Sequence, residues 1–334
     1  MRRAPFRRAL RIPPHHSSLN SNSNSILMIP TSISTRHLSS STTSIDMPRL
    51  NPESQNAINR LRAFKPPPTN YDLVPLSRRA AVLVLLYADA RGDLRVVLTI
   101  RASTLSSYAG QAALPGGKAD SESETPLQTA RREAQEEIGL PGLTNPLPPP
   151  FTVEHLCEIP CSLARTELAV RPCVALLHTF NEATGRNADP ETELIPRLDA
   201  REVAAVFTAP FRDFLFLLGA REDDEEWYRG VWTEWLGTRW RMHQFFVPIN
   251  PQKVIKPKPH HQAQEDAVHQ LEEQEKETSG KAIRYRVFGM TARILVDVAR
   301  IAYCREPEFE HNRHTGDEEL ITRLRGAGKL GAKI

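Results

Sequence analysis

The sequence predicts an α/β fold in which a mixed β-sheet packs between helices. Three observations favour this class: a β-rich hairpin, further short apolar runs of strand length, and amphipathic helical segments among them. The 334 residues are 40% hydrophobic and 25% charged, which is typical of a globular protein long enough for one large domain. The longest apolar run, residues 80–87, is strand-sized, so the sequence excludes a transmembrane helix.

The elements can be predicted in chain order from local patterns. Residues 80–87 and 94–100 are β-rich, and the turn between them contains Gly92, so together they predict a hairpin. Further strands are expected at residues 151–156, 168–178, 202–208 and 244–249. Further helices are expected at residues 211–219 and 291–303.

The clearest helix spans residues 125–138. Thr125 suits the N-cap, Pro126 suits the first helical position, and Gln128 completes a capping box. Gly139 supplies a left-handed stop. One apolar stripe faces the core and consists of Leu127, Ala130, Ala134 and Ile138.

The composition of the chain changes along its length. Three consecutive prolines at residues 66–68 are typical of a linker, and a later stretch dense in Lys, Glu, Gln and His is typical of a solvated insertion. The predicted segments are a disordered or targeting segment at 1–50, a Pro-rich linker at 51–77, one domain at 78–325 with a charged insertion at about 253–281, and a tail at 326–334.

Both ends of the chain resemble targeting signals. The first 45 residues hold six Arg, eleven Ser and no acidic residue, a composition typical of mitochondrial transit segments. A disordered tail without a role is the alternative, and initiation at Met47 would remove the segment. The last residues, Ala332, Lys333 and Ile334, resemble a peroxisomal C-terminal address. We therefore expect a mitochondrial or a peroxisomal protein, and the N-terminal composition favours the mitochondrion.

The net charge of +3 comes from the N-terminal segment. Residues 1–46 carry six Arg and Asp46 and sum to +5, which leaves 3 − 5 = −2 for the rest. A slightly acidic body without a basic stripe predicts no nucleic-acid partner. Four Cys are too few for a disulfide framework at this length and suit a reducing compartment. No pattern of Ser, Cys or His suggests a nucleophile or a zinc site, and the sequence leaves the oligomeric state open.

Three glutamates lie on one patch of the predicted helix. Glu133, Glu136 and Glu137 are at positions i, i+3 and i+4, so their carboxylates project beside the apolar stripe. Like charges at this spacing repel, and Arg132 offsets one of them through Glu136. Carboxylates gathered on a rigid element are the hard ligands that Mg²⁺ or Mn²⁺ requires. The alternative for the triplet alone is an ordinary acidic surface helix.

Two glycines precede this helix. Gly116 and Gly117 allow the backbone to approach a ligand closely, and Pro115 restricts the direction of approach. A strand, a glycine loop and a carboxylate-bearing helix in this order predict a site for a metal ion and a phosphate group.

This segment resembles the signature of the Nudix hydrolase family: Gly, five residues, Glu, seven residues, Arg-Glu, an aliphatic, any residue, Glu-Glu, any residue, Gly, an aliphatic. The matching positions are Glu124, Arg132, Glu133, Ala134, Glu136, Glu137, Gly139 and Leu140. Ala134 is smaller than the usual aliphatic residue. Gly117 lies one residue earlier than the signature places it, and Lys118 stands at the expected position. This one-residue extension is similar to the branch of the family that hydrolyses coenzyme A.

Segments on both sides of the signature resemble the same branch. Upstream, the matching residues are 97–102, Gly110, Gln111 and 114–117. Downstream, they are 288–293, Glu202, Val203 and Pro210. Ser106 stands where the branch usually has a second Arg, and Leu114 replaces a Phe. The resemblance spans about residues 78–303.

The resemblance implies an α/β/α sandwich with a metal-binding helix after the Gly-Gly loop. It implies that water attacks a nucleoside diphosphate linkage, here in coenzyme A or acyl-coenzyme A, and releases 3′,5′-ADP and 4′-phosphopantetheine or its acyl form. Glu133 and Glu137 would bind Mg²⁺ or Mn²⁺ together with the carbonyl of Gly117. Glu136 would be a third ligand or the base, and Arg132 would orient the carboxylates.

The resemblance also suggests residues on the substrate side and leaves alternatives. Candidates for contact with coenzyme A are Arg101, Gly110, Gln111 and Gly116. Glu202 is a candidate for an extra metal ligand or base, although an ordinary strand-leading acid fits it equally. Other substrates, such as ADP-ribose, NADH or a nucleoside triphosphate, share the same signature. The other alternative is a catalytically silent Nudix fold that acts as a binding module. The presence of all three signature glutamates disfavours it, because silent members tend to lose them.

Overall fold

The computed structural model describes residues 50–101, 111–194, 203–218, 227–249, 254–256 and 284–331. These residues belong to the unit that spans Asp46–Ile334. The N-terminal segment, most of the charged insertion and the last three residues lie outside them, as do the site candidates Gly110 and Glu202. Among the described residues, every helix is too short or too polar to cross a membrane.

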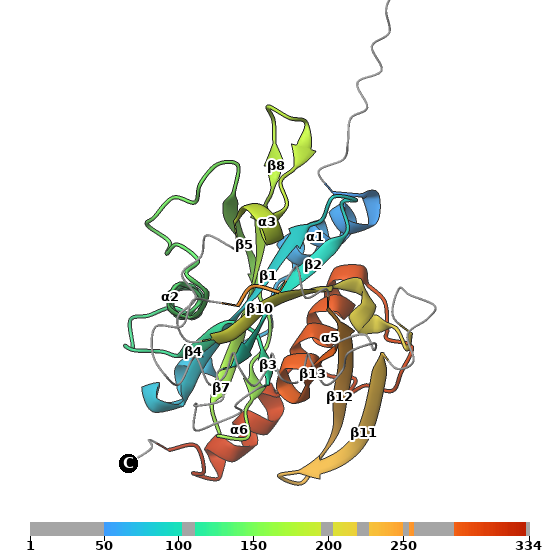
Figure 1. The fold of residues 1–334 in the computed structure, drawn as a ribbon. Coiled ribbons are helices and arrows are strands. Elements are labelled where there is room, and N and C mark those ends of the chain that lie inside the picture. The colour runs from blue at the N-terminus through green and yellow to red at the C-terminus, as the bar shows by residue number, and fades with distance from the viewer. Residues whose placement is uncertain are drawn as a thin grey trace, which may run out of the picture. The chain divides into compact units, whose positions relative to one another are not determined.

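A mixed sheet forms the centre of the described unit (Figure 1). Its main strands follow the order β10-β2-β1-β7-β5, and the short strands β3, β4 and β6 pair with β2, β1 and β7. The strands are β1 (Arg79–Ala88), β2 (Leu94–Arg101), β3 (Ala112–Ala113), β4 (Gly116–Lys118), β5 (Thr152–Glu158), β6 (Ser162–Leu163), β7 (Ala169–His178) and β10 (Val203–Pro210). β1 and β7 run parallel and the other pairs run antiparallel, so the predicted mixed sheet is confirmed.

The predicted hairpin is the pair β1–β2. Leu86 lies opposite Val96, and the amide of Asp89 donates to the carbonyl of Asp93 across the turn. Gly92 has a φ of 79° there, a conformation that favours glycine. The strands predicted at 151–156, 168–178 and 202–208 correspond to β5, β7 and β10.

Helices cover both faces of this sheet. α2 (Pro126–Ile138) packs on one face, and α1 (Pro52–Ala63) and α5 (Gly289–Tyr303) pack on the other (Figure 1). Alternate residues of β1 divide between the two layers, because neighbouring strand residues point to opposite faces. Those on the α2 side are Leu83, Leu85 and Tyr87, and those on the α1/α5 side are Val84 and Leu86.

A second, three-stranded antiparallel sheet packs against α5. It consists of β11 (Tyr228–Trp235), β12 (Thr238–Pro248) and β13 (Arg284–Phe288). The sequence predicted only the end of β12, at residues 244–249. The remaining elements are short: η1 (Tyr71–Leu73), η2 (Leu76–Arg78), β8 (Phe180–Asn181), β9 (Arg186–Asn187), α3 (Pro190–Glu193), η4 (Arg212–Leu215) and α6 (Glu318–Gly326).

Three predictions need correction. Residues 51–77 are not a linker throughout, because α1 begins after the N-cap Asn51 and buries Ala57, Ile58 and Leu61 in the core. The helix predicted at 211–219 is only the 3₁₀ turn η4, since Phe216 is already extended. The predicted tail is partly packed, because Leu330 lies in a buried cluster with Tyr71 and Leu163.

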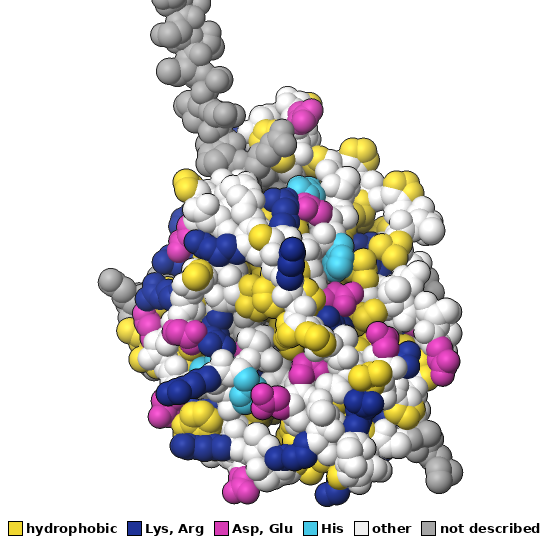
Figure 2. Space-filling model, turned by 180° about the vertical axis from the view of Figure 1, so that it is seen from behind, with side chains coloured by type: hydrophobic (Ala, Val, Ile, Leu, Met, Phe, Trp, Pro, Cys, Tyr) yellow, Lys and Arg dark blue, Asp and Glu magenta, His cyan; other side chains and the backbone are white. Residues whose placement is uncertain are grey.

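One face of the described part carries both signs of charge. On the face drawn in Figure 2, Lys and Arg side chains are interspersed with Asp and Glu.

Candidate active site

The glycine strand and the glutamate helix are held together by local structure. β4 pairs with β1, and Ala81 lies opposite Gly117. Thr125 caps α2 with the predicted capping box, in which Thr125 and Gln128 each accept from the other's backbone amide. Gly139 ends the helix with a φ of 70°. The predicted stripe faces the core, with Ala130, Ala134 and Ile138 buried and Leu127 partly buried.

Glu133 lies directly over the backbone of Gly117. A Cβ atom built on Gly117 would overlap all three atoms of the Glu133 carboxylate group. Any larger residue would force the carboxylate to move, so glycine at this position lets Glu133 lie against the β4 backbone. Burial raises the pKa of the Glu133 carboxyl above its usual value, and the hydrogen bond from Arg132 opposes that rise.

Glu137 contacts the neighbouring glycine. Its side chain is only 9% exposed, and the amide of Gly116 donates to Oε2 at 3.1 Å. Arg101 approaches the other carboxylate oxygen, with Nη1 3.7 Å from Oε1. A Cβ on Gly116 would collide with the backbone of Ala81 and Val82, so this glycine allows β4 to approach β1 closely.

Arg132 links the carboxylates of the helix to the preceding loop. Its Nη1 lies 3.0 Å from Glu133 and 3.3 Å from the half-exposed Glu136, the i,i+4 pair that the sequence predicted. Its Nε lies 2.9 Å from Glu124, and Nη2 donates to the carbonyl of Lys118. These contacts raise the pKa of Arg132, chiefly through the hydrogen bond to Glu124.

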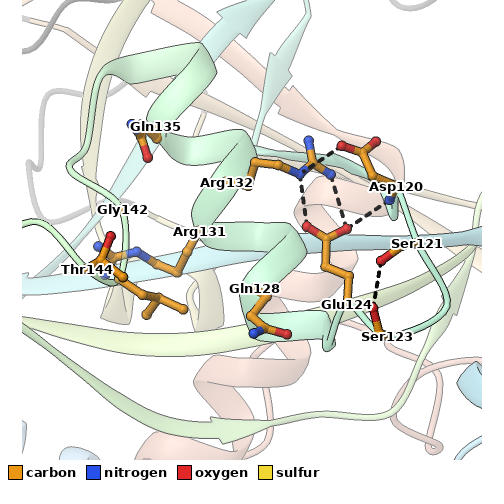
Figure 3. Close-up of a pocket in the computed structure, with 11 residues that line it drawn as sticks. Asp120, Ser121, Ser123, Glu124, Gln128, Arg131, Arg132, Gln135, Gly142 and Thr144 are labelled. Carbon is orange, nitrogen blue, oxygen red and sulfur yellow. Dashed lines mark hydrogen bonds and ion pairs between the residues drawn. The ribbon is translucent and has the colours of Figure 1, made fainter.

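Sequence reasoning missed two of these partners. Glu124 matched the family signature but received no role, and Asp120, 3.2 Å from the Arg132 Nε, was not singled out (Figure 3). The amide of Asp120 donates to Glu124, so the loop before α2 closes around the arginine. The available signal was the Glu124 position in the signature, which lies eight residues before Arg132.

The carboxylates present the donor chemistry of a hard divalent cation. Glu133 and Glu137 approach β4 from the same face of α2: the Glu133 carboxylate lies against the backbone of Gly117, and Glu137 accepts from the amide of Gly116. Within the described residues, no three acidic, His or Cys side chains converge on one point, because Glu133 and Glu136 turn to Arg132 while Glu137 turns to Gly116. The residues therefore fit such an ion by donor type, with side-chain rotation required for all three to reach it.

The substrate-side candidates lie at the end of β2. The amide of Arg101 donates to the carbonyl of Gln111, so these two residues are adjacent. The Arg101 Nε is buried and has no hydrogen-bond partner among the described residues. Arg101 also pairs in register with Val203, the residue after Glu202, so the described backbone brings the start of β10 beside it. Gly110 and Glu202 themselves lie outside the described residues.

The cysteines do not contribute to this site. All four are free thiols, and Cys157, Cys161 and Cys173 are buried. Burial raises the pKa of Cys157 and of Cys161 to about 12, so both remain protonated near neutral pH.

Comparison with known proteins gives one family and several relatives. Residues 77–231 match the NUDIX domain model. Peroxisomal coenzyme A diphosphatase 1 of Saccharomyces cerevisiae is 32% identical over 288 residues, which cover 80% of this chain and 82% of that protein. Nudix hydrolase 15, mitochondrial, of Arabidopsis thaliana is 31% identical over 70% of this chain. Nudix hydrolase 22, chloroplastic, of the same plant is 32% identical over 70% of this chain. The chain spans 61% and 58% of the two plant proteins.

Proposed function

The chain belongs to the Nudix hydrolase family, and we propose that it hydrolyses coenzyme A and acyl-coenzyme A. The products are 3′,5′-ADP and 4′-phosphopantetheine or its acyl form. One observation carries the substrate: the similarity to the yeast coenzyme A diphosphatase covers 80% of the chain, well beyond the residues that match the NUDIX model. The upstream segment that contains Arg101, Gly110 and Gln111 supports the same substrate.

The proposed reaction is hydrolysis of one bond between phosphorus and the bridging oxygen of the diphosphate. The water oxygen bonds to one phosphorus, the bond from that phosphorus to the bridging oxygen breaks, and the water loses a proton. Glu133, Glu137 and the carbonyl of Gly117 are the proposed ligands for Mg²⁺ or Mn²⁺. When bound, such an ion neutralises the phosphate charge and lowers the pKa of coordinated water.

The protein groups have separate roles in this proposal. Glu136, which is half exposed, accepts the proton from the attacking water or serves as a third ligand. Arg132 holds Glu133 and Glu136 from one side and is itself fixed by Glu124, so it positions carboxylates and does not touch substrate. Arg101 presents positive charge beside Glu137, where it would face the diphosphate with Gly116 and Gln111 nearby. Glu202 remains a proposed extra ligand or base.

An organelle is the proposed location. The three relatives are named for the peroxisome, the mitochondrion and the chloroplast. The Arg-rich, acid-poor N-terminus supports the mitochondrion, and the final Ala332, Lys333 and Ile334 support the peroxisome when translation starts at Met47.

Product analysis tests the proposed reaction. The full chain is given coenzyme A, acetyl-coenzyme A, ADP-ribose or NADH with Mg²⁺ or Mn²⁺, and products are separated by chromatography. We expect 3′,5′-ADP from the coenzyme A substrates, and its release by Glu137→Gln should be at least about 100-fold slower. Hydrolysis in ¹⁸O-labelled water identifies the phosphorus that is attacked. Faster cleavage of ADP-ribose or NADH would overturn the proposal that coenzyme A is the substrate. No turnover of any of these substrates would overturn the proposal that the chain is an active hydrolase.

A further inference from the structure

A pocket lies beside α2, on the side away from Glu133. It has a volume of about 400 Å³ and lies between α2, the loop before it and the loop after it (Figure 3). Arg131, Gln128 and Gln135 of the helix line it. Residues two apart on a helix point about 200° apart around its axis, so Arg131 faces away from Glu133. Arg132 and Glu124 also line the pocket, so it adjoins the candidate active site at that end, while Arg131 lies on the side of α2 away from Glu133.

Arg131 has an unusual environment for a buried charge. Four arginines among the described residues are buried, namely Arg78, Arg131, Arg171 and Arg293. Three of them pair with carboxylates: Arg78 with Glu167, Arg171 with Glu158 and Arg293 with Asp317. In the described part of the chain, Arg131 alone of the four has no carboxylate partner.

The hydrogen bonds of Arg131 are also incomplete. It is 4% exposed, and Nη2 donates to the carbonyl of Pro141 at 2.5 Å. Its Nε is buried without a hydrogen-bond partner among the described residues. Buried charges in proteins are normally paired, so an anion is the missing partner of Arg131.

The other lining groups suit an oxyanion with many acceptor atoms. Ser121, Ser123, Gln128, Gln135 and Thr144 supply hydroxyl and amide donors around the pocket. Asp120 and Glu124 line its other end, where Arg132 holds both of them, and Arg131 points away from that end (Figure 3). The planar guanidinium binds phosphate through paired hydrogen bonds.

We propose that this pocket binds a phosphate group through Arg131, on the side of α2 opposite Glu133. The volume exceeds that of a single oxyanion and falls in the range of small-molecule sites. Inorganic phosphate and a phosphorylated small molecule share this chemistry, and the test separates them.

The test measures thermal unfolding of the metal-free full chain at constant ionic strength. Inorganic phosphate replaces NaCl stepwise, and a ligand that binds the folded state raises the midpoint. We expect a saturable rise for the wild type and for Arg165→Gln, a control that removes one exposed arginine elsewhere. Glu133→Gln keeps the rise, because that glutamate lies on the other face of the helix. Arg131→Gln loses it, with affinity reduced about 10- to 100-fold.

Three further measurements complete the test. Without phosphate, Arg131→Gln unfolds at the same temperature as the wild type or higher, because an unpaired buried charge is removed. If that variant does not fold, the exposed lining residues replace it: Gln135→Ala and Thr144→Val each weaken phosphate binding about fivefold. Glycerol 3-phosphate binding more tightly than inorganic phosphate assigns the site to a phosphorylated molecule, and equal binding assigns it to the free anion.

The proposal is overturned if phosphate raises the unfolding midpoint of Arg131→Gln as much as that of the wild type. If Arg131→Gln does not fold, the same rise in both Gln135→Ala and Thr144→Val overturns it. It is also overturned if phosphate stabilises the wild type no more than NaCl does. The readout is binding, not hydrolysis, so its failure is independent of the proposed enzymatic activity.

Discussion

Replacing Gly117 with Ala tests whether the close contact between β4 and Glu133 matters for catalysis. The new methyl group would overlap the Glu133 carboxylate, which must move by about 1 Å to reach van der Waals distance. Displacement of a reacting group by that amount costs about 100-fold in rate, or about 2.7 kcal/mol of activation free energy. We therefore expect kcat for coenzyme A to fall about 100-fold in Gly117→Ala.

The fold should survive this change. Gly117 is not among the residues with a left-handed φ, and the atoms that its Cβ meets belong to the end of a side chain. Gly→Ala at such a position alters the free energy of unfolding by less than about 1 kcal/mol. By contrast, Gly116→Ala brings a methyl group into the backbone of Ala81 and Val82, and it should destabilise the protein by more than about 3 kcal/mol.

Gly142→Ala is the matched control. Its Cβ would also meet the end of a helix side chain, Gln135, but on the opposite face of α2. Steady-state kinetics give kcat for each variant, and urea unfolding gives stability. Wild-type kcat in Gly117→Ala, or an equal loss in Gly142→Ala, would refute the assignment of Glu133 to the reacting centre.

Three further predictions use the same assays. Glu137→Gln keeps an acceptor for the Gly116 amide but loses a charge, so kcat falls at least about 100-fold while urea unfolding is nearly unchanged. Arg62 lowers the pKa of Glu154 to about 2, so the stability that this pair contributes is present above pH 4.5 and is lost as pH falls toward 2. The difference in unfolding free energy between wild type and Arg62→Gln, measured by urea unfolding, should therefore disappear over that range. Burial lowers the pKa of His243 to about 2, so stability falls by up to about 1.4 kcal/mol per pH unit below pH 6.5 as the unfolded chain takes up a proton, and His243→Gln should reduce this slope. An unchanged slope would contradict the buried, neutral state of this imidazole.

Elements with local signals were predictable from the sequence, and elements that depend on distant contacts were not. α2 carries its own cap, stripe and stop within fifteen residues, so its bounds followed from spacing alone. α1 is polar over most of its length and precedes three prolines. It is helical because it packs on α5, as the hydrogen bond from Arg60 to the carbonyl of Ala302 illustrates.

The second sheet was missed for a related reason. β11 is half exposed along most of its length, so its apolar residues do not alternate cleanly with polar ones. β13 joins β12 across the charged insertion, and no local pattern specifies pairing over that distance. The turn at Leu236 and Gly237, both with positive φ, was the available hairpin signal.

In the site, spacing predicted the shared face of the glutamates but not their partners. Arg131 and Arg132 are adjacent and chemically identical, yet one lies buried beside the apolar stripe and the other joins four carboxylates. The difference follows from the 100° between successive helix positions, combined with loop 119–124, whose path no local motif determines.

The two glycines and two of the glutamates form matched pairs, which gives a physical reason for the displaced signature glycine. Glu133 lies over Gly117 and Glu137 lies beside Gly116, so at this contact α2 and β4 run in opposite directions. The four-residue step on the helix covers about 6 Å, and one step on the strand covers about 3.3 Å. Long glutamate side chains span the difference. The extra residue then lies in the connection between Gly117 and Glu124, which Arg132 binds through the carbonyl of Lys118 and the carboxylate of Glu124. An insertion at that point lengthens the connection while leaving both glycine–glutamate contacts intact, so the spacing departure leaves the arrangement of the carboxylates unchanged.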